Sequence, residues 1–504
     1  MVADDPGQRA GHGHDHGGGG QRALPVQGAE LSRPQGACLM TDLRRTFAAT
    51  DDLIVAPGRL LLGHGPQSDM AVLLRDGRFA EIGERAALRA RHPAARLAEM
   101  PGHLMMPGFI DTHTHLTQSL GKSLVFGEPS EIFRRIWVPL EGSLDEHMVY
   151  LSSKLAALEC LRGGFTTAVD AGTRSAGHIG KLVQASREAG LRLVVAQICN
   201  DLGGAAQVPG RAEILCRAEA HLAAYQGDPL IHASLAISIP EVASDAMLRD
   251  ISQMAAGAGV TFQTHVNEHL VAVERSLVAN GRRPLEHLAH VGALGPQTLI
   301  AHSTLVTPSE LNLLRDTGTA VAYNPVASVW KGNAVAPALQ MQALGIRFGL
   351  GTDGTRADGF RLMDAAETMQ RVGYGLASGD SSCGGGWLWL DAATRMAADA
   401  SGLSAVTGRI AEGLAADFLL VDLDRPELTP SHDLSWELVR YGNRDQIDAV
   451  FTNGRLRMVQ GWPVDWDARA LMAEIRELAA PAIAAAPIQR IHPTADSLIA
   501  TRHA

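Results

Sequence analysis

Strand-like and helix-like segments alternate eight times between about Phe109 and Met369, which limits the possible folds more than any other feature of the chain. Each strand-like run is short, apolar and bounded by turn-forming residues, as expected of strands buried on both faces of a parallel sheet. Eight such units with short connections predict a closed (β/α)8 barrel, the TIM-barrel fold. The runs begin near residues 109, 166, 191, 230, 261, 298, 320 and 347, and helical periodicity is clearest over 144–161, 179–189, 212–225 and 245–258.

Metal-binding residue types stand where several of these runs end. His113 and His115 are separated by one residue, so on a strand both side chains point to the same face and can hold one metal ion. Later runs supply His265 with Glu268 three residues beyond it, His302, and Asp353. The carboxyl ends of barrel strands converge on one face, so residues far apart in sequence meet there. The pattern therefore favours metal chemistry over a set of ordinary strand-end histidines.

Five further stretches accompany these residues: Met106-Pro-Gly-Phe-Ile-Asp-Thr-His-Thr-His115, Ile136-Trp-Val-Pro-Leu-Glu141, Gly163-Gly-Phe-Thr-Thr-Ala-Val-Asp170, Leu350-Gly-Thr-Asp-Gly354 and Gly413-Leu-Ala-Ala-Asp-Phe-Leu-Leu420. Together they resemble the amidohydrolase superfamily, and within it the aminohydrolases that include cytosine, guanine and S-adenosylhomocysteine deaminases and triazine hydrolases. The similarity covers roughly residues 51–462, and so many ordered motifs do not agree by chance. The resemblance implies a (β/α)8 barrel beside a small β-sandwich built from both chain flanks.

The resemblance also implies one divalent metal ion, held by His113, His115, His265 and Asp353. Such an ion lowers the pKa of a water molecule toward neutrality and so supplies the nucleophile. Asp353 is expected to take the first proton from that water as well as to bind the metal. Zinc is the favoured ion, with iron as the alternative.

Two further residues are expected to act on the substrate during the reaction. Glu268 is placed to carry a proton to the leaving nitrogen. His302 is expected to polarise the attacked carbon or to steady the oxyanion. Superfamily members with two metals usually carry a lysine at the end of the fourth strand, and residues 230–240 contain none, which indicates a single ion.

Three residues are candidates for substrate contact. Gln118 resembles the amide-reading glutamine of some heterocycle deaminases, because one amide can both donate and accept at a ring N–C=O edge. Trp137 is either a wall on which a ring stacks or a packing residue. Lys331 either contacts an anionic or carbonyl group of the substrate or is an ordinary exposed lysine, which is slightly favoured. No role is assigned to His269, His287 and His290.

The predicted activity is hydrolytic deamination of an amino-substituted nitrogen heterocycle, such as a purine, pyrimidine, pterin or triazine, with release of ammonia. Two departures from the family pattern argue against a nucleoside as the substrate. Ser238-Ile-Pro240 stands in place of a Pro-His pair, and Ser328-Val329 stands in place of Ser-Asn. Hydrolysis of an amide, a urea or a chlorotriazine by the same residues is the alternative, because fold does not separate these reactions. An inactive family member is disfavoured, since every expected ligand and proton carrier is present.

The chain divides into four predicted parts. Residues 1–45 are expected to be a disordered leader, since they hold histidines at 12, 14 and 16, many glycines and few apolar residues. Met40 is the expected biological start. Residues 46–106 and 404–465 are predicted to form the β-sandwich, and 107–403 the hydrolase barrel. Residues 466–504 are predicted to be a tail that is helical to about Ala485 and loose beyond it.

The composition favours a location in the cytoplasm. The net charge of −10 argues against a nucleic-acid or anionic-membrane partner, and no apolar run approaches the ~20 residues that span a bilayer. The cysteines lack a C-x-x-C spacing and are predicted to be free thiols in a reducing compartment: Cys38, Cys160, Cys199, Cys216 and Cys383. The expected partners are a small-molecule substrate and water, and the resemblance implies a homodimer or larger homo-oligomer.

Overall fold

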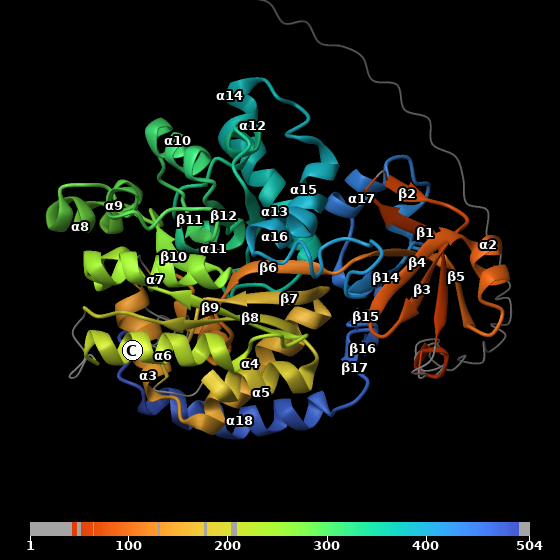
Figure 1. Ribbon diagram of the computed structural model, residues 1–504, viewed down its shortest axis with the longest axis horizontal. Coiled ribbons are helices and arrows are strands. Elements are labelled where there is room, and N and C mark those ends of the chain that lie inside the picture. The colour runs from red at the N-terminus through yellow and green to blue at the C-terminus, as the bar shows by residue number, and fades with distance from the viewer. Residues whose placement is uncertain are drawn as a thin grey trace, which may run out of the picture.

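The structure is a computed structural model that describes residues 43–47, 52–63, 65–128, 132–175, 179–202 and 209–492. A barrel and a smaller sheet domain lie side by side, with the small domain at the right of Figure 1. The histidines at 12, 14 and 16, the expected start at Met40 and most of the predicted leader lie outside the described residues. Of the leader's last three residues, Leu43 is buried against the small domain.

Eight parallel strands form the barrel sheet, and their spatial order follows the chain from β6 to β13. The first and last strands also lie next to each other, so the sheet curls almost into a closed ring. The predicted (β/α)8 barrel is therefore confirmed. The strands are β6 (Phe109–Thr114), β7 (Phe165–Asp170), β8 (Arg192–Ile198), β9 (Ile231–Ala236), β10 (Phe262–Val266), β11 (Thr298–His302), β12 (Ala320–Tyr323) and β13 (Phe348–Leu350).

The seam between the last and first strands is joined by hydrogen bonds just beyond β13. The backbone N–H of Asp353 donates to the His113 carbonyl at 2.8 Å. The backbone N–H of Thr352 donates to Asp111 Oδ1 at 2.8 Å, and its hydroxyl donates to Asp111 Oδ2 at 2.5 Å. Ring closure thus places Asp353 directly beside the His113-x-His115 pair.

Helices cover the outside of the barrel (Figure 1). A capping box begins α10, because the Thr307 hydroxyl accepts from the Glu310 N–H at 3.3 Å and the Glu310 carboxylate accepts from the Thr307 N–H at 2.9 Å. The principal helices are α4 (Glu146–Arg162), α5 (Ile179–Ala189), α6 (Arg211–Ala224), α7 (Asp245–Ala258), α8 (Leu270–Asn280), α9 (Pro284–Val291), α10 (Pro308–Thr317), α11 (Pro325–Lys331), α13 (Gly359–Gln370), α15 (Gly385–Ala393) and α16 (Arg395–Ala400).

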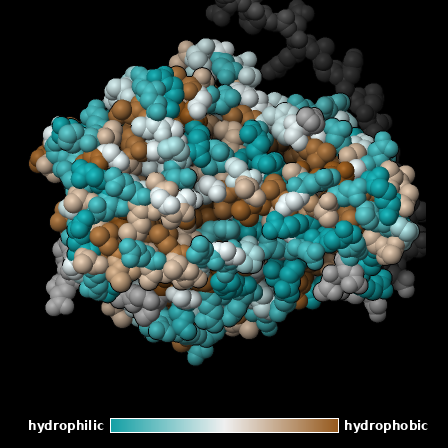
Figure 2. Space-filling model, in the orientation of Figure 1, coloured by the Kyte–Doolittle hydropathy of each residue, from teal (hydrophilic) through white to brown (hydrophobic). Residues whose placement is uncertain are grey.

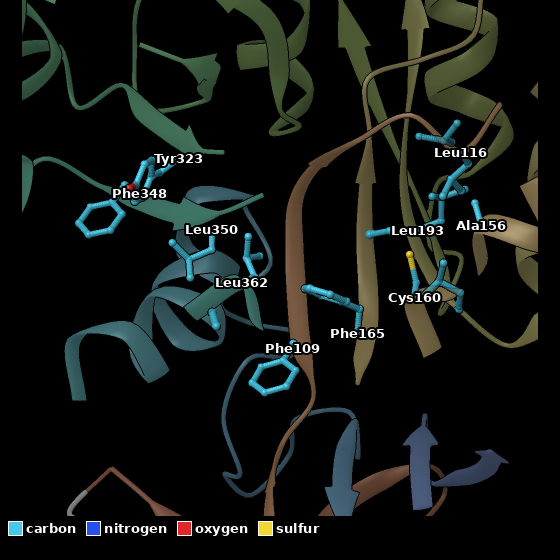
Figure 3. Packing of buried hydrophobic residues seen from close by; sticks show 14 of the residues in the cluster. Phe109, Leu116, Ala156, Cys160, Phe165, Leu193, Tyr323, Phe348, Leu350 and Leu362 are labelled. Carbon is cyan, nitrogen blue, oxygen red and sulfur yellow. The ribbon is translucent and has the colours of Figure 1, made fainter. Parts of the chain in front are cut away.

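Aromatic side chains close the amino-terminal end of the barrel, opposite the strand ends that carry the polar residues. Phe109 at the start of β6 packs against Phe165 of the neighbouring strand, with 6.0 Å between ring centroids, as Figure 3 shows. Phe360 of α13 meets the Phe109 ring edge-on at 5.1 Å. All three rings are fully buried. This end of the barrel is consequently a packed core that stabilises the fold.

Strands from both flanks of the chain build the small domain, as predicted. β5 pairs in parallel with β1 and antiparallel with β14, so one mixed sheet joins the two flanks. The first strand, β1, is long, and its pairing with β5 has a register shift between Pro57 and Arg59. The sheet contains β1 (Leu53–Leu62), β2 (Gly65–Gln67), β3 (Met70–Arg75), β4 (Arg78–Glu84), β5 (Arg96–Pro107), β14 (Phe418–Asp422), β15 (Ile447–Thr452), β16 (Arg455–Val459) and β17 (Trp462–Pro463).

A buried ion pair fastens the small domain to the barrel. Arg192, the first residue of β8, donates from Nε to Asp417 Oδ2 at 2.8 Å, and both side chains have no exposed surface. Its Nη1 donates to the Pro229 carbonyl at 2.6 Å. Nearly every polar atom of this guanidinium is therefore engaged, which is the condition for burying a charge without a large penalty.

The helical tail, α18 (Ala468–Ala485), ends where predicted and runs beneath α4 in Figure 1. The chain beyond it is not loose as far as residue 492. The N–H groups of Ile491 and His492 donate to the Glu128 carboxylate at 3.1 and 3.2 Å, and the Gln489 N–H donates to the Arg135 carbonyl at 2.9 Å. The tail is thus tied to the loop that follows β6.

Polar residues cover most of the face in Figure 2, and apolar residues are scattered in small groups. Within the described part of the chain, no helix combines the length and apolar character that crossing a membrane requires.

Candidate active site

Five metal-binding side chains converge at the carboxyl end of the barrel. The Nε2 atoms of His115 and His265 are 3.3 Å apart, and Asp353 Oδ1 lies 3.5 Å from Nε2 of both His113 and His115. Ligand atoms of His113, His265, His302 and Asp353 all lie within 4.8 Å of one another. The structure thus brings together the four predicted metal ligands, and it places His302 inside the same cluster.

The ring nitrogens of this cluster fit a divalent metal ion. The Nε2 atoms of His113 and His302 are buried and have no hydrogen-bond partner among the described residues. Burial lowers the pKa of His115 and His265 well below that of an ordinary histidine, so both rings are neutral, as metal ligands are. His265 Nδ1 donates to the Ser238 carbonyl at 2.7 Å, which leaves its Nε2 free to face an ion.

Two residues of the cluster hold a strained backbone. The φ angles of His302 and Asp353 are +74° and +54°, in the left-handed region that costs a residue other than glycine about 1–3 kcal/mol. Hydrogen bonds impose this geometry: the Ser303 N–H donates to the Val266 carbonyl at 3.0 Å, and the Asp353 N–H donates to His113. The strain turns both side chains from their own strands toward the cluster.

Lys331, the last residue of α11, lies between two acidic residues of the site. Its Nζ donates to Asp353 Oδ2 at 2.6 Å and to Glu268 Oε1 at 2.9 Å, and its side chain is only 20% exposed. The favoured interpretation of Lys331 as an ordinary exposed lysine was therefore wrong. The position of Lys331 in the sequence does not indicate its contacts with Asp353 and Glu268, because they depend on how α11 packs at the carboxyl end of the barrel.

These contacts set the charge of the site near neutral pH. Burial lowers the pKa of His302 to about 4, so this ring is neutral at pH 7. Burial alone would raise the pKa of Glu268, but the positive charges of His302 and Lys331 outweigh it and lower that pKa. Since His302 is neutral at pH 7, Lys331 is the cation that acts there. Asp353 is likewise held ionised, with Lys331 opposing the effect of burial on its pKa.

A small cavity opens beside the cluster. Its volume is about 50 Å³. Since a cavity volume of ~10–15 Å³ holds one water molecule, this cavity takes a few water molecules or one flat ring. All three predicted substrate contacts lie on its wall, together with the expected proton carrier and three of the four expected metal ligands: Gln118, Trp137, Lys331, Glu268, His115, His265 and Asp353. The structure therefore places the expected substrate contacts and the expected chemistry around one space.

Three other residues of the wall were not singled out in the sequence. Arg174 follows β7 by four residues, and Glu128 lies in the loop after β6. His269, to which no role was assigned, lines the cavity while its Nδ1 accepts from the Ala272 N–H at 3.3 Å at the start of α8. The signal that could have found Arg174 is its place in a βα loop, at the face where barrel enzymes hold their sites.

The chain is similar to proteins of known activity over most of its length. It is 28% identical over 414 residues to a 5-methylthioadenosine/S-adenosylhomocysteine deaminase of Syntrophobacter fumaroxidans, covering 81% of this chain and 92% of that one. It is 27% identical over 419 residues to a 5'-deoxyadenosine deaminase of Methanothermobacter thermautotrophicus, covering 82% and 94%.

A solved structure shows the same architecture. The crystal structure of an adenosine deaminase from Xanthomonas campestris with bound zinc superimposes with a TM-score of 0.79 at 25% identity, covering 86% of this chain and 98% of that one. Residues 104–457 match the amidohydrolase family, and residues 71–95 match a bacterial imidazolonepropionase-like composite domain. The predicted hydrolase class, with action on a carbon–nitrogen bond, is confirmed. The barrel, its strand-end cluster and this match together show that the chain belongs to the amidohydrolase family.

Proposed function

We propose that this protein hydrolytically deaminates an amino-substituted nitrogen heterocycle and releases ammonia. The observation that carries the proposal is the position of Glu268, an ionised carboxylate on the wall of a ring-sized cavity beside the metal-binding cluster. A carboxylate there can accept a proton from water and deliver it to a leaving nitrogen. The deaminase names of the similar proteins support the same reaction.

We propose that one zinc ion is held by His113, His115, His265 and Asp353. When bound, the ion supplies Lewis acidity that makes water nucleophilic near neutral pH. The zinc in the Xanthomonas campestris deaminase supports this choice of metal. His302, neutral at pH 7 and oriented by the Asn324 amide 3.2 Å from its Nδ1, would direct Nε2 toward the attacked carbon.

The remaining residues have separate tasks in this proposal. Asp353 accepts the first proton of the attacking water and passes it to the ring nitrogen beside the attacked carbon. Glu268 accepts the second proton of that water and transfers it to the amino nitrogen, which leaves as ammonia. Lys331 holds one oxygen of each carboxylate and so fixes which oxygens face the substrate. Gln118 reads a ring edge and Trp137 covers a ring face.

A flat base suits the cavity better than a nucleoside. The volume of about 50 Å³ fits one ring system. Ser238, which stands where related nucleoside deaminases carry a Pro-His pair, uses its carbonyl to orient His265. This position therefore supports the metal site.

An ammonia-release screen tests the proposed function. Zinc-loaded protein is incubated with aminopurines, aminopyrimidines, pterins and aminotriazines, and chelator-treated protein is the control. Ammonia released only by the metal-loaded protein supports the proposal and identifies the substrate class. If no compound of the panel releases ammonia but amides or ureas are hydrolysed, the proposal is overturned in favour of another carbon–nitrogen hydrolase.

We also propose that the enzyme works in the reducing cytoplasm as a homodimer or larger homo-oligomer. In support, the described cysteines are all free thiols: Cys160, Cys199, Cys216 and Cys383. Sedimentation analysis of the purified protein tests the oligomeric state, and a monomer at micromolar concentration would contradict it.

A further inference from the structure

We propose that Arg174 is a specificity residue whose guanidinium binds two adjacent acceptor atoms in the plane of the substrate ring. Either a carboxylate or a ring nitrogen beside an exocyclic oxygen has this chemistry. The inference rests on the proposed function only in placing a heterocycle in the cavity beside Glu268.

Arg174 is positioned to touch a ligand in that cavity. It lines the wall together with Gln118 and Lys331. The same cavity is lined by His115 and Asp353 of the metal-binding cluster. A ring held by Arg174 therefore lies within the same small space as the reacting groups.

Buried partners fix the guanidinium on one side and on one face. Nη1 donates to Glu141 Oε2 at 2.8 Å, and the Phe133 ring lies 4.4 Å from Cζ. Glu141 has no exposed surface and is itself held, because Thr117 Oγ1 donates to its Oε1 at 2.6 Å and Ser175 Oγ donates to its carbonyl at 2.7 Å. Arg174 is thus preorganised by groups that cannot move freely.

The opposite edge of the guanidinium has no such partner. Nε and Nη2 of Arg174 are both buried, and neither has a hydrogen-bond partner among the described residues. The whole side chain is 11% exposed. Buried guanidinium donors in native proteins are nearly always paired, so two adjacent unpaired donors on a residue that lines the cavity point to a ligand.

The geometry of that edge defines the ligand. The N–H groups on Nε and Nη2 are parallel and coplanar, so they match two acceptors that lie side by side in one plane. A carboxylate offers such a pair, and so does the oxygen and ring nitrogen edge of an oxopurine. Lys331 cannot play this part, because its ammonium is already engaged by Glu268 and Asp353.

Binding measurements with two matched pairs of ligands test the proposal without requiring turnover. Zinc-loaded full-length protein is titrated calorimetrically with 6-aminonicotinate and 6-aminonicotinamide, and separately with hypoxanthine and purine. The wild type is expected to bind the acceptor-rich member of one pair at least about tenfold more tightly than its partner. The pair that shows the difference identifies the source of the acceptors.

Arg174→Lys is the principal variant, because it retains the charge beside Glu141 but lacks the two-donor edge. It is expected to abolish the difference within the pair while it changes the affinity for the acceptor-poor member less than about twofold. Arg217→Met, which removes an exposed arginine on α6, is the matched control and should retain the wild-type difference. Thermal unfolding shows whether each variant is folded.

Equal wild-type affinities within both pairs, or no binding of the acceptor-rich ligands, would overturn the proposal even if Arg174→Lys does not fold. Equal weakening of both members of a pair by Arg174→Lys would also overturn it, because that result indicates a structural role alone. A third outcome separates the two proposals. If the affinity difference depends on Arg174 but no compound releases ammonia in the screen, the proposed deamination is rejected and the binding role of Arg174 stands.

Discussion

Lys331 Nζ lies 2.6 Å from Asp353 Oδ2, while Oδ1 of the same carboxylate faces His113 and His115. The two oxygens of Asp353 therefore serve different partners. One oxygen is available to a metal ion, and the other is held by an ammonium that also holds Glu268. This arrangement links the metal-binding cluster to the proposed proton carrier, Glu268, through one lysine.

Removing the Lys331 charge should shift the acid limb of the pH profile. The ammonium lowers the pKa of Glu268, so Lys331→Met should raise that pKa and move the acid limb of kcat/KM to higher pH. The acid limb should move by about one pH unit or more, the usual effect of removing a neighbouring opposite charge on a carboxyl pKa. Lys331→Arg retains a positive charge and should move the limb much less. An unchanged acid limb in Lys331→Met would contradict the effect of the Lys331 charge on the pKa of Glu268.

Glu268→Gln should separate chemistry from metal binding. The amide cannot carry the proton, so turnover should fall by about 10²- to 10⁴-fold. The zinc content, measured by elemental analysis, should remain that of the wild type because Glu268 is not among the proposed ligands. Near-normal ammonia release by this variant would refute the proton-transfer role.

Metal removal should destabilise the folded protein. Without an ion, the ring nitrogens of the cluster remain buried and close together, and an ion that binds only the folded state stabilises it by about 4 kcal/mol at a thousandfold excess over Kd. Scanning fluorimetry should show a lower Tm after chelation and recovery with zinc. His265→Ala should lose this response, whereas His290→Ala, at an exposed position of α9, should retain it.

Glu128 should make the attachment of residues 489–492 dependent on pH. Burial alone would raise its pKa, but hydrogen bonds from Arg135, Ile491 and His492 outweigh it and lower the pKa to about 2. Because the folded pKa is below the unfolded value of about 4.3, the attachment is fully stabilised above that value and is lost as pH falls toward 2. Hydrogen exchange, corrected for intrinsic rates, should show protection of Ile491 and His492 at pH 5 that disappears near pH 2. Glu128→Gln should lack the transition.

Arg192→Met should weaken the joint between the barrel and the small domain. The substitution leaves Asp417 buried without its cation, which costs about 3–5 kcal/mol in the free energy of unfolding. Arg187→Met removes a partly exposed ion pair with Asp228 and should cost less than about 1 kcal/mol. Equal losses in the two variants, measured by chemical denaturation, would contradict a special role for the buried pair.

The barrel and the ligand cluster could be predicted because both leave local marks in the sequence. The strands are apolar runs of similar length, and each ligand stands at the end of its own run, as in Thr298–His302. The topology of the fold then requires those ends to meet. A pattern that repeats along the chain is therefore sufficient to place residues such as His113 and Asp353 together.

The contacts of Lys331, Arg174 and Glu128 could not be predicted in the same way. Each depends on how a loop or short helix folds back over the barrel mouth, and no periodic pattern records that path. Arg174, after β7, donates a hydrogen bond to Glu141 in the segment between β6 and α4. Glu128 accepts a hydrogen bond from Ile491, near the other end of the chain. Such pairings are tertiary, so they leave no signal at either residue's own position.

The strained backbone at His302 and Asp353 has a consequence for the order of assembly. The hydrogen bonds that impose the strain run between neighbouring strands, including the first and the last of the barrel. A fluctuating chain does not hold these residues in place before the ring is complete, so it offers no preformed site to an ion. The nitrogen and oxygen atoms that would hold a metal ion therefore come together only once the barrel is complete.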